Sequence, residues 1–166
     1  RRDQVGIFTY SNKKNFKFMK PDGGEYHFYS VLDNVAKVKP QGRCQVVEAM
    51  DYFTKRHQKR SLVFIISDLE SDVEDIDKAV RKLLPFNHTV IIINVFSPWF
   101  EIHETDLSTT DKALAEAISE EMMEHILLIK QNLRNMRVNI ITTGPDDMIN
   151  RVLQNYLEAK KKGREF

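Results

Sequence analysis

The chain has 166 residues, of which 42% are hydrophobic and 30% charged, a balance typical of one globular domain that excludes disordered, collagen-like and fibrous proteins. Its 25 Lys and Arg residues against 24 Asp and Glu residues leave a formal charge of +1, too small to draw in nucleic acid. Cys44 is the single cysteine, so no internal disulfide forms, which fits a reducing compartment such as the cytoplasm.

The apolar runs are short. The longest, "LVFII" and "TVIIINVF", fall well below the roughly 20 residues that span a bilayer. The opening "RRDQVGIF" passes directly from charge into a β-like segment and offers no signal-peptide core. We therefore expect no membrane segment in these residues.

The first elements in chain order are a hairpin and a helix. Residues 4–10 and 15–20 read as two strands joined by "SNKKN", and the lysines of the second suit a sheet edge. After the turn signal "PDGG", apolar residues recur at near-helical spacing from Tyr26 to Val35, which predicts the first helix.

Helices and wholly apolar strands then alternate. The predicted helices cover residues 45–57, 72–84, 111–135 and 145–162, and the strands cover 61–67, 88–95 and 137–143. Strands that are apolar on both faces need a layer of helices on each side. The pattern predicts a single α/β domain over residues 1–166: a three-layer α/β/α fold with a mostly parallel open sheet, an antiparallel edge strand and a loose tail at 160–166.

Two finer expectations concern side chains. The apolar stripe of the long helix predicts core packing along its length, at Leu114, Ile118, Met122, Ile126, Ile129 and Leu133. The histidines at 27, 57, 88 and 125 lie on separate predicted elements, so we expect them at the surface or at its boundary.

Oxygen-bearing side chains follow the predicted strands. In open α/β sheets ligands bind at the carboxyl ends of the strands. The residues at these exits, together with the loop "PQGRC" before the second helix, are Thr9, Tyr10, Ser11, Ser67, Asp68, Glu70, Ser97, Trp99, Thr142 and Thr143. Hydroxyl and carboxylate oxygens favour Mg²⁺ or Mn²⁺ over zinc.

The position of Asp68 allows two interpretations. It ends the apolar run "SLVFIIS", and it is either the N-cap of the following helix or one corner of a cation site. The spacing of Asp68, Glu70 and Asp72 also suits a two-metal phosphoester hydrolase. His103, Glu104 and Asp106 form a weaker candidate cluster, because no His-x-x-x-His spacing supports it.

The order of the motifs adds a resemblance. "RRDQVGIFTYS", "PQG", "SLVFIISDLES", "TVIIINVFSPWFEI" and "NYLEAKKKGREF" together resemble the von Willebrand factor A-like domain of an uncharacterised bacterial and archaeal family, domain of unknown function 58. Members are commonly encoded beside AAA+ ATPases of the MoxR type. The resemblance implies a non-enzymatic adaptor that binds such an ATPase during complex assembly or maturation.

Such domains hold a divalent cation between three loops. Asp68 matches the aspartate of the third loop, whereas Cys44 stands where the second loop has a threonine, and a thiol suits Mg²⁺ poorly. The Asp-x-Ser-x-Ser of the first loop is absent. We therefore expect Asp68 and Cys44 to form a degenerate site that binds no Mg²⁺ or Mn²⁺ tightly. A longer protein that supplies the first loop could bind one of these cations.

The family's first strand is also absent. The resemblance implies that the chain is the C-terminal part of a longer protein, often membrane-anchored in the family. Without that strand, residues 4–10 and 61–67 either pair with each other or leave a gap that a second chain fills, giving a homodimer through the incomplete sheet.

Overall fold

The computed structural model describes residues 3–11, 15–39, 45–67, 73–95, 108–144 and 146–162. The chain divides into two compact units. The first comprises residues 1–59 and 74–86, and the second comprises residues 60–73 and 87–166. The chain therefore passes between the units at three points.

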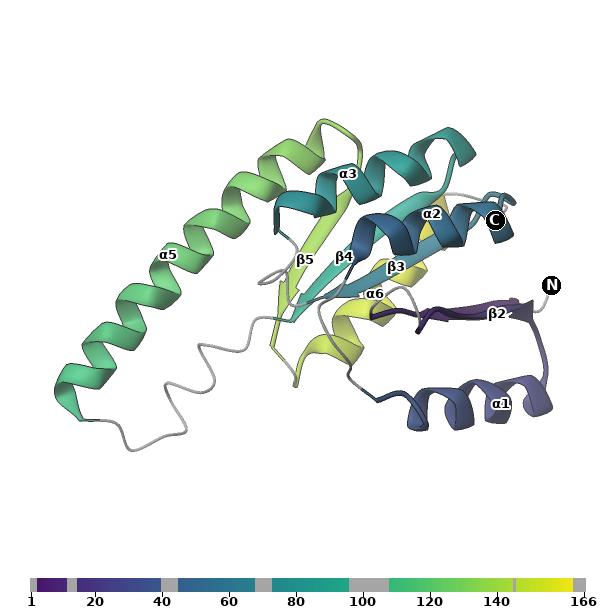
Figure 1. Ribbon diagram of the computed structural model, residues 1–166, viewed down its shortest axis with the longest axis horizontal. Helices are drawn as coiled ribbons and strands as arrows, with labels where there is room; N and C mark the ends of the chain where they lie inside the picture. The colour runs from purple at the N-terminus through teal and green to yellow at the C-terminus, as the bar shows by residue number, and fades with distance from the viewer. Residues whose placement is uncertain are drawn as a thin grey trace. The chain divides into compact units, whose positions relative to one another are not determined.

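The described residues of the first unit form a β-hairpin and three helices (Figure 1). Strands β1 (Val5–Thr9) and β2 (Lys17–Asp22) pair antiparallel, with Phe8 opposite Phe18. Its helices are α1 (Glu25–Ala36), α2 (Val46–Arg56) and α3 (Val73–Leu83), and the 3-10 turn η1 (Leu84–Phe86) follows α3.

Gly6 is required where the hairpin has an irregular register. The pairing shifts between Val5 and Ile7. A Cβ at Gly6 would lie 2.9 Å from the carbonyl oxygen of Met19 and 3.0 Å from the nitrogen of Pro21. Only glycine allows the two strands to approach this closely.

Aromatic side chains hold the hairpin on α2. The ring of Phe8 stacks on Tyr52 at 5.8 Å between centroids and lies 5.9 Å from Phe53, and Phe18 meets Phe53 edge-on at 5.8 Å. Such pairs contribute beyond the area they bury. An ion pair of 2.7 Å between Asp51 and Lys82 joins α2 to α3.

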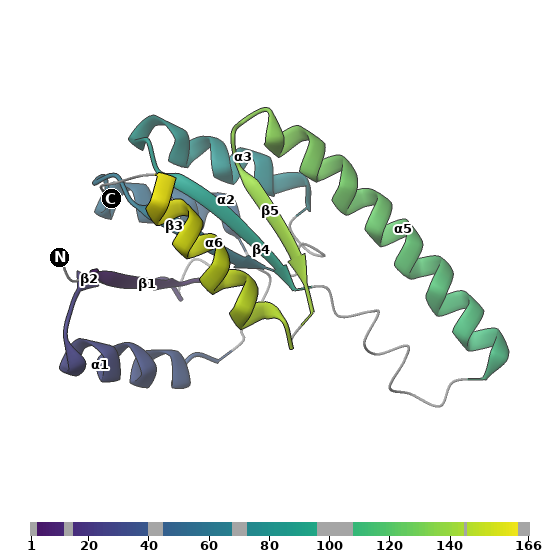
Figure 2. The ribbon, with the colours of Figure 1, turned by 180° about the vertical axis from the view of Figure 1, so that it is seen from behind.

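The second unit is built on a parallel sheet. Strands β3 (Leu62–Ser67), β4 (Thr89–Val95) and β5 (Asn139–Thr143) lie in the order β3-β4-β5. Helices α5 (Thr109–Arg134) and α6 (Met148–Lys162) are the helices among its described residues. Figure 2 shows α6 across one face of the sheet, where its apolar residues pack against Ile91, Ile93 and Ile141.

These elements confirm the predicted α/β class. Every predicted helix and strand is present with its ends within a few residues, the three apolar strands are parallel, and residues 4–10 and 15–20 form the antiparallel pair. The described strands form two separate sheets, so β3 has β4 as its one paired neighbour. Helix α6 includes Lys160 to Lys162, three residues of the expected tail.

The expectation for the long helix is wrong in its first half. Ile126, Ile129 and Leu133 are buried, but Leu114 and Ile118 are 62% and 50% exposed. A helix of 26 residues is about 39 Å long, whereas a strand of five residues is about 17 Å long. The sheet is thus too short to cover the whole stripe.

The expectation for His88 is also wrong. Its side chain is 7% exposed and therefore buried. His88 directly precedes β4, whose central five residues are all buried, so the chain is already inside the protein at this position. In addition, no helix in the described part of the chain is long and apolar enough to cross a membrane.

Candidate functional site

The two residues of the predicted cation site lie outside the described residues. The same holds for other predicted candidates: Asp68, Glu70, Asp72, Cys44, Ser97, Trp99, His103, Glu104 and Asp106. Within the described ranges, no three His, Cys, Asp or Glu side chains gather where they would hold a metal ion. The cation site of Asp68 and Cys44 therefore stays a prediction.

A row of polar side chains crosses the carboxyl end of the parallel sheet. The strand register places Ser67 of β3 opposite Asn94 of β4, and Asn94 opposite Thr142 of β5. Paired residues of a parallel sheet project from the same face. The sequence predicted two of these residues at the rim, and the register brings them together with Asn94.

Two members of this row are buried without hydrogen-bond partners. Asn94 is fully buried, and neither its Oδ1 nor its Nδ2 has a partner among the described residues. The Oγ1 of Thr142 is likewise buried and unpaired there. A buried polar group without a partner costs about 1–3 kcal/mol, and the row retains donors and acceptors that the other described residues do not satisfy. A polar ligand group would satisfy them.

The neighbouring residue of β5 shows the opposite arrangement. Thr143 projects from the other face of the sheet, and its hydroxyl donates to the carbonyl oxygen of Gly144 at 3.2 Å. The predicted rim residues Thr142 and Thr143 are therefore not equivalent. Only the first belongs to the polar row.

In the first unit, too, a polar residue follows the end of a strand. Ser11 follows β1, and its carbonyl oxygen accepts a hydrogen bond of 3.0 Å from the backbone nitrogen of Gln45, which precedes α2. The Oγ of Ser11 and the Oε1 of Gln45 are buried and unpaired among the described residues. Gln45, the residue before α2, therefore lies beside the exit of β1.

Helix α1 is the second candidate site because its apolar face points outward. Phe28, Tyr29, Leu32 and Val35 are 57%, 59%, 48% and 44% exposed, and α1 has no buried residue. At 100° per residue these four side chains share one side of the helix. An exposed apolar surface of this kind is typical of binding surfaces.

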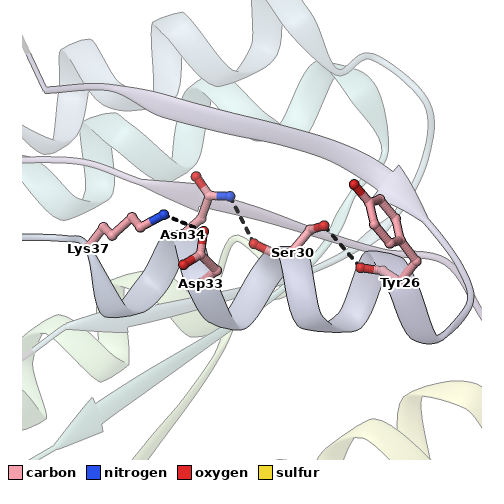
Figure 3. Close-up of polar contacts among 5 residues, drawn as sticks. All are labelled: Tyr26, Ser30, Asp33, Asn34 and Lys37. Atoms are coloured by element: carbon pink, nitrogen blue, oxygen red, sulfur yellow. Dashed lines mark hydrogen bonds and ion pairs between the residues drawn. The ribbon is translucent and has the colours of Figure 1, made fainter.

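The opposite side of α1 carries polar contacts. His27 donates through Nε2 to the carbonyl oxygen of Val5 in β1 at 2.7 Å. Along the helix, Ser30 donates to the carbonyl oxygen of Tyr26 at 3.0 Å, and Asn34 donates to that of Ser30 at 2.8 Å (Figure 3). Helix α1 therefore turns a largely polar side to the hairpin.

Sequence reasoning missed Asn94 and the exposure of α1. Asn94 is a single amide inside the run "TVIIINVF", and a single polar residue does not interrupt the pattern of a buried strand. Its polarity was the available signal, because a buried amide needs a partner. For α1 the periodicity predicted the helix but not which side is covered.

The parallel sheet and its polar carboxyl edge place the protein in the broad class of α/β proteins. The sequence model described as "Protein of unknown function DUF58" matches residues 1–144, so the chain belongs to this family. Neither a curated protein nor a solved structure matches the chain.

Proposed function

We propose that the chain is a non-enzymatic protein-interaction module of von Willebrand factor A type. In this role it is an adaptor for a MoxR-type AAA+ ATPase in complex assembly or maturation. Family membership and the resemblance of its motifs support the class of partner. The exposed apolar side of α1 is the observation that carries the proposal.

The spacing on α1 suits a helix that enters a groove. Phe28, Leu32 and Val35 stand at positions i, i+4 and i+7, the anchors by which an amphipathic helix fills an apolar groove of its partner. Tyr29 adds an aromatic ring beside them, and aromatic residues are enriched among the side chains that dominate binding energy.

Binding of the chain to the AAA+ ATPase encoded beside it tests the proposal. In a calorimetric titration, Leu32→Glu should weaken binding more than tenfold because it places a charge in the apolar contact. Leu114→Glu on α5 is the matched control, since Leu114 is also an exposed leucine and lies in the other unit. Equal binding by both variants would contradict the role of α1.

The alternative function is a metal-dependent phosphoester hydrolase that uses the acidic corner at Asp68. Asn94 and Thr142 favour it, because their side chains have no hydrogen-bond partner among the described residues and lie in register with Ser67, the residue that precedes Asp68 in the chain. Hydrolysis of a generic phosphoester with Mn²⁺ that Asp68→Ala abolishes would support the hydrolase. Absence of turnover by a chain that binds the ATPase would exclude it.

A further inference from the structure

Helix α1 is held in place without the burial of any side chain. It has 12 residues, none of them buried. Isolated helices of this length are marginal in water, because the first turn is costly to form and most helical stability in proteins comes from packing of an apolar face. The apolar side of α1 is turned outward, so the helix and its orientation depend on contacts of its polar side.

His27 connects this polar side to the hairpin. Its Nε2 donates to the carbonyl oxygen of Val5 at 2.7 Å, across 22 positions of the chain. The hydroxyl of Ser30 and the amide of Asn34 instead donate to carbonyl oxygens of α1 itself, which stabilises the helix but does not orient it. At 100° per residue, His27 lies about 140° around the helix from Leu32. Its bond to β1 therefore turns Leu32 away from the hairpin.

The entry into α1 is defined as well. Gly24 precedes the helix with φ 96° and ψ 165°, a backbone conformation open almost only to glycine, and it provides no side-chain cap. Gly24 thus sets the direction in which the helix leaves the hairpin. The hydrogen bond of His27 sets the rotation of the helix about its axis.

We propose that His27 is a positioning residue, whose bond to Val5 holds α1 on the hairpin with its apolar side outward. This role rests on the proposed function, in which Phe28, Leu32 and Val35 enter a groove of the partner. A binding surface that is ordered in advance loses less entropy on association. The apparent dissociation constant rises in inverse proportion to the fraction of chains with the surface in place. Loss of the His27 bond therefore weakens binding although no contact with the partner is removed.

Hydrogen exchange in the free chain tests this role without a partner. In His27→Leu the amides of α1 should exchange about three- to tenfold faster, the range that one neutral hydrogen bond gives, and those of α2 should be unchanged. Leucine favours the helix more than histidine does, so helix propensity would act in the opposite direction. His27→Gln should restore slow exchange, because its Nε2 also donates and lies about as far from the backbone.

Binding to the AAA+ ATPase encoded beside the chain is the second measurement. In a calorimetric titration, His27→Leu should bind about three- to tenfold more weakly than the unmodified chain, and His27→Gln should bind like it. His125→Leu on α5 is the matched control, since His125 is also an exposed helical histidine and lies in the other unit. It should change neither binding nor exchange in α1.

Three results would overturn the proposal. Unchanged exchange of α1 in free His27→Leu would show that the bond does not hold the helix, and weaker binding in that case would mean that His27 touches the partner directly. Faster exchange in α2 as well would show that His27 stabilises the whole first unit. Weak binding by His27→Gln despite slow exchange would likewise indicate direct contact.

The proposed function fails separately. If the unmodified chain does not bind the ATPase, α1 is not the docking surface for that partner. The exchange of α1 in the free variants still decides whether His27 holds the helix in place.

Discussion

Thr142 and Thr143 are neighbours on β5 whose hydroxyls have opposite surroundings. The buried Oγ1 of Thr142 has no partner among the described residues, whereas that of Thr143 donates to Gly144. Thr142→Val should therefore raise the free energy of unfolding by about 1 kcal/mol, and Thr143→Val should lower it by about 1 kcal/mol. Urea denaturation of both variants measures the two values.

A shift in the same direction for both threonines would contradict this account of the polar row. A stabilising Thr142→Val would show that the hydroxyl is kept at a cost to folding, as is common where a residue serves binding.

His57 gives the first unit a pH dependence. Its ring follows α2 and lies 6.2 Å from Phe18 and 5.6 Å from Phe53 between centroids. Burial among these rings, and secondly the charge of Lys59, lower the pKa of His57 below its ordinary value of about 6.5. The folded chain therefore binds fewer protons than the unfolded chain just below that pH.

It follows that stability falls as the pH drops from about 6.5 through the lowered pKa of His57, because protonation favours the unfolded chain. Urea denaturation across this range measures the slope. His57→Gln should remove the contribution of this residue, and a slope unchanged in that variant would assign the pH dependence to other groups.

Among the helices, α3 and α1 are both amphipathic, but their apolar sides differ in burial. Leu83 on α3 is fully buried, whereas Leu32 on α1 is 48% exposed. Leu83→Ala should lower the free energy of unfolding by about 2–5 kcal/mol because it leaves a cavity. Leu32→Ala should change it by less than about 0.5 kcal/mol.

Thermal or urea denaturation of these two variants separates folding from binding. A large loss of stability in Leu32→Ala would show that α1 is packed in the isolated chain, and its apolar side would then not be available to a partner.

The helices and strands also show how much the hydrophobic periodicity of the sequence can predict. Alternating helices and apolar strands were predictable because each period follows from local geometry and burial. Which apolar helix faces are buried was not predictable. Helix α1 and the first half of α5 have apolar stripes like those of packed helices, yet these stripes are exposed. Whether a stripe is covered depends on the size and position of distant elements.

The same limit applies to the candidate site. The strand exits at Ser67 and Thr142 were predictable from the sequence because each follows an apolar run. The row they form with Asn94 was not, because it depends on the register of three strands that are far apart in the chain.

At the scale of the whole molecule, the two units are interleaved in the chain. The segment 74–86 belongs to the first unit although it lies between two segments of the second. A cut at one position therefore cannot separate the units, and each variant must be studied in the whole chain. The alternation of elements in the sequence contains no signal for this division.

The proposed function depends on binding of a protein partner by the outward apolar side of α1. Hydrogen exchange of the backbone amides, with and without the neighbouring AAA+ ATPase, tests it most directly. We expect exchange to slow in α1 when the ATPase is bound and to stay unchanged in α3. Protection confined to other elements, with α1 unchanged in a complex that forms, would contradict it.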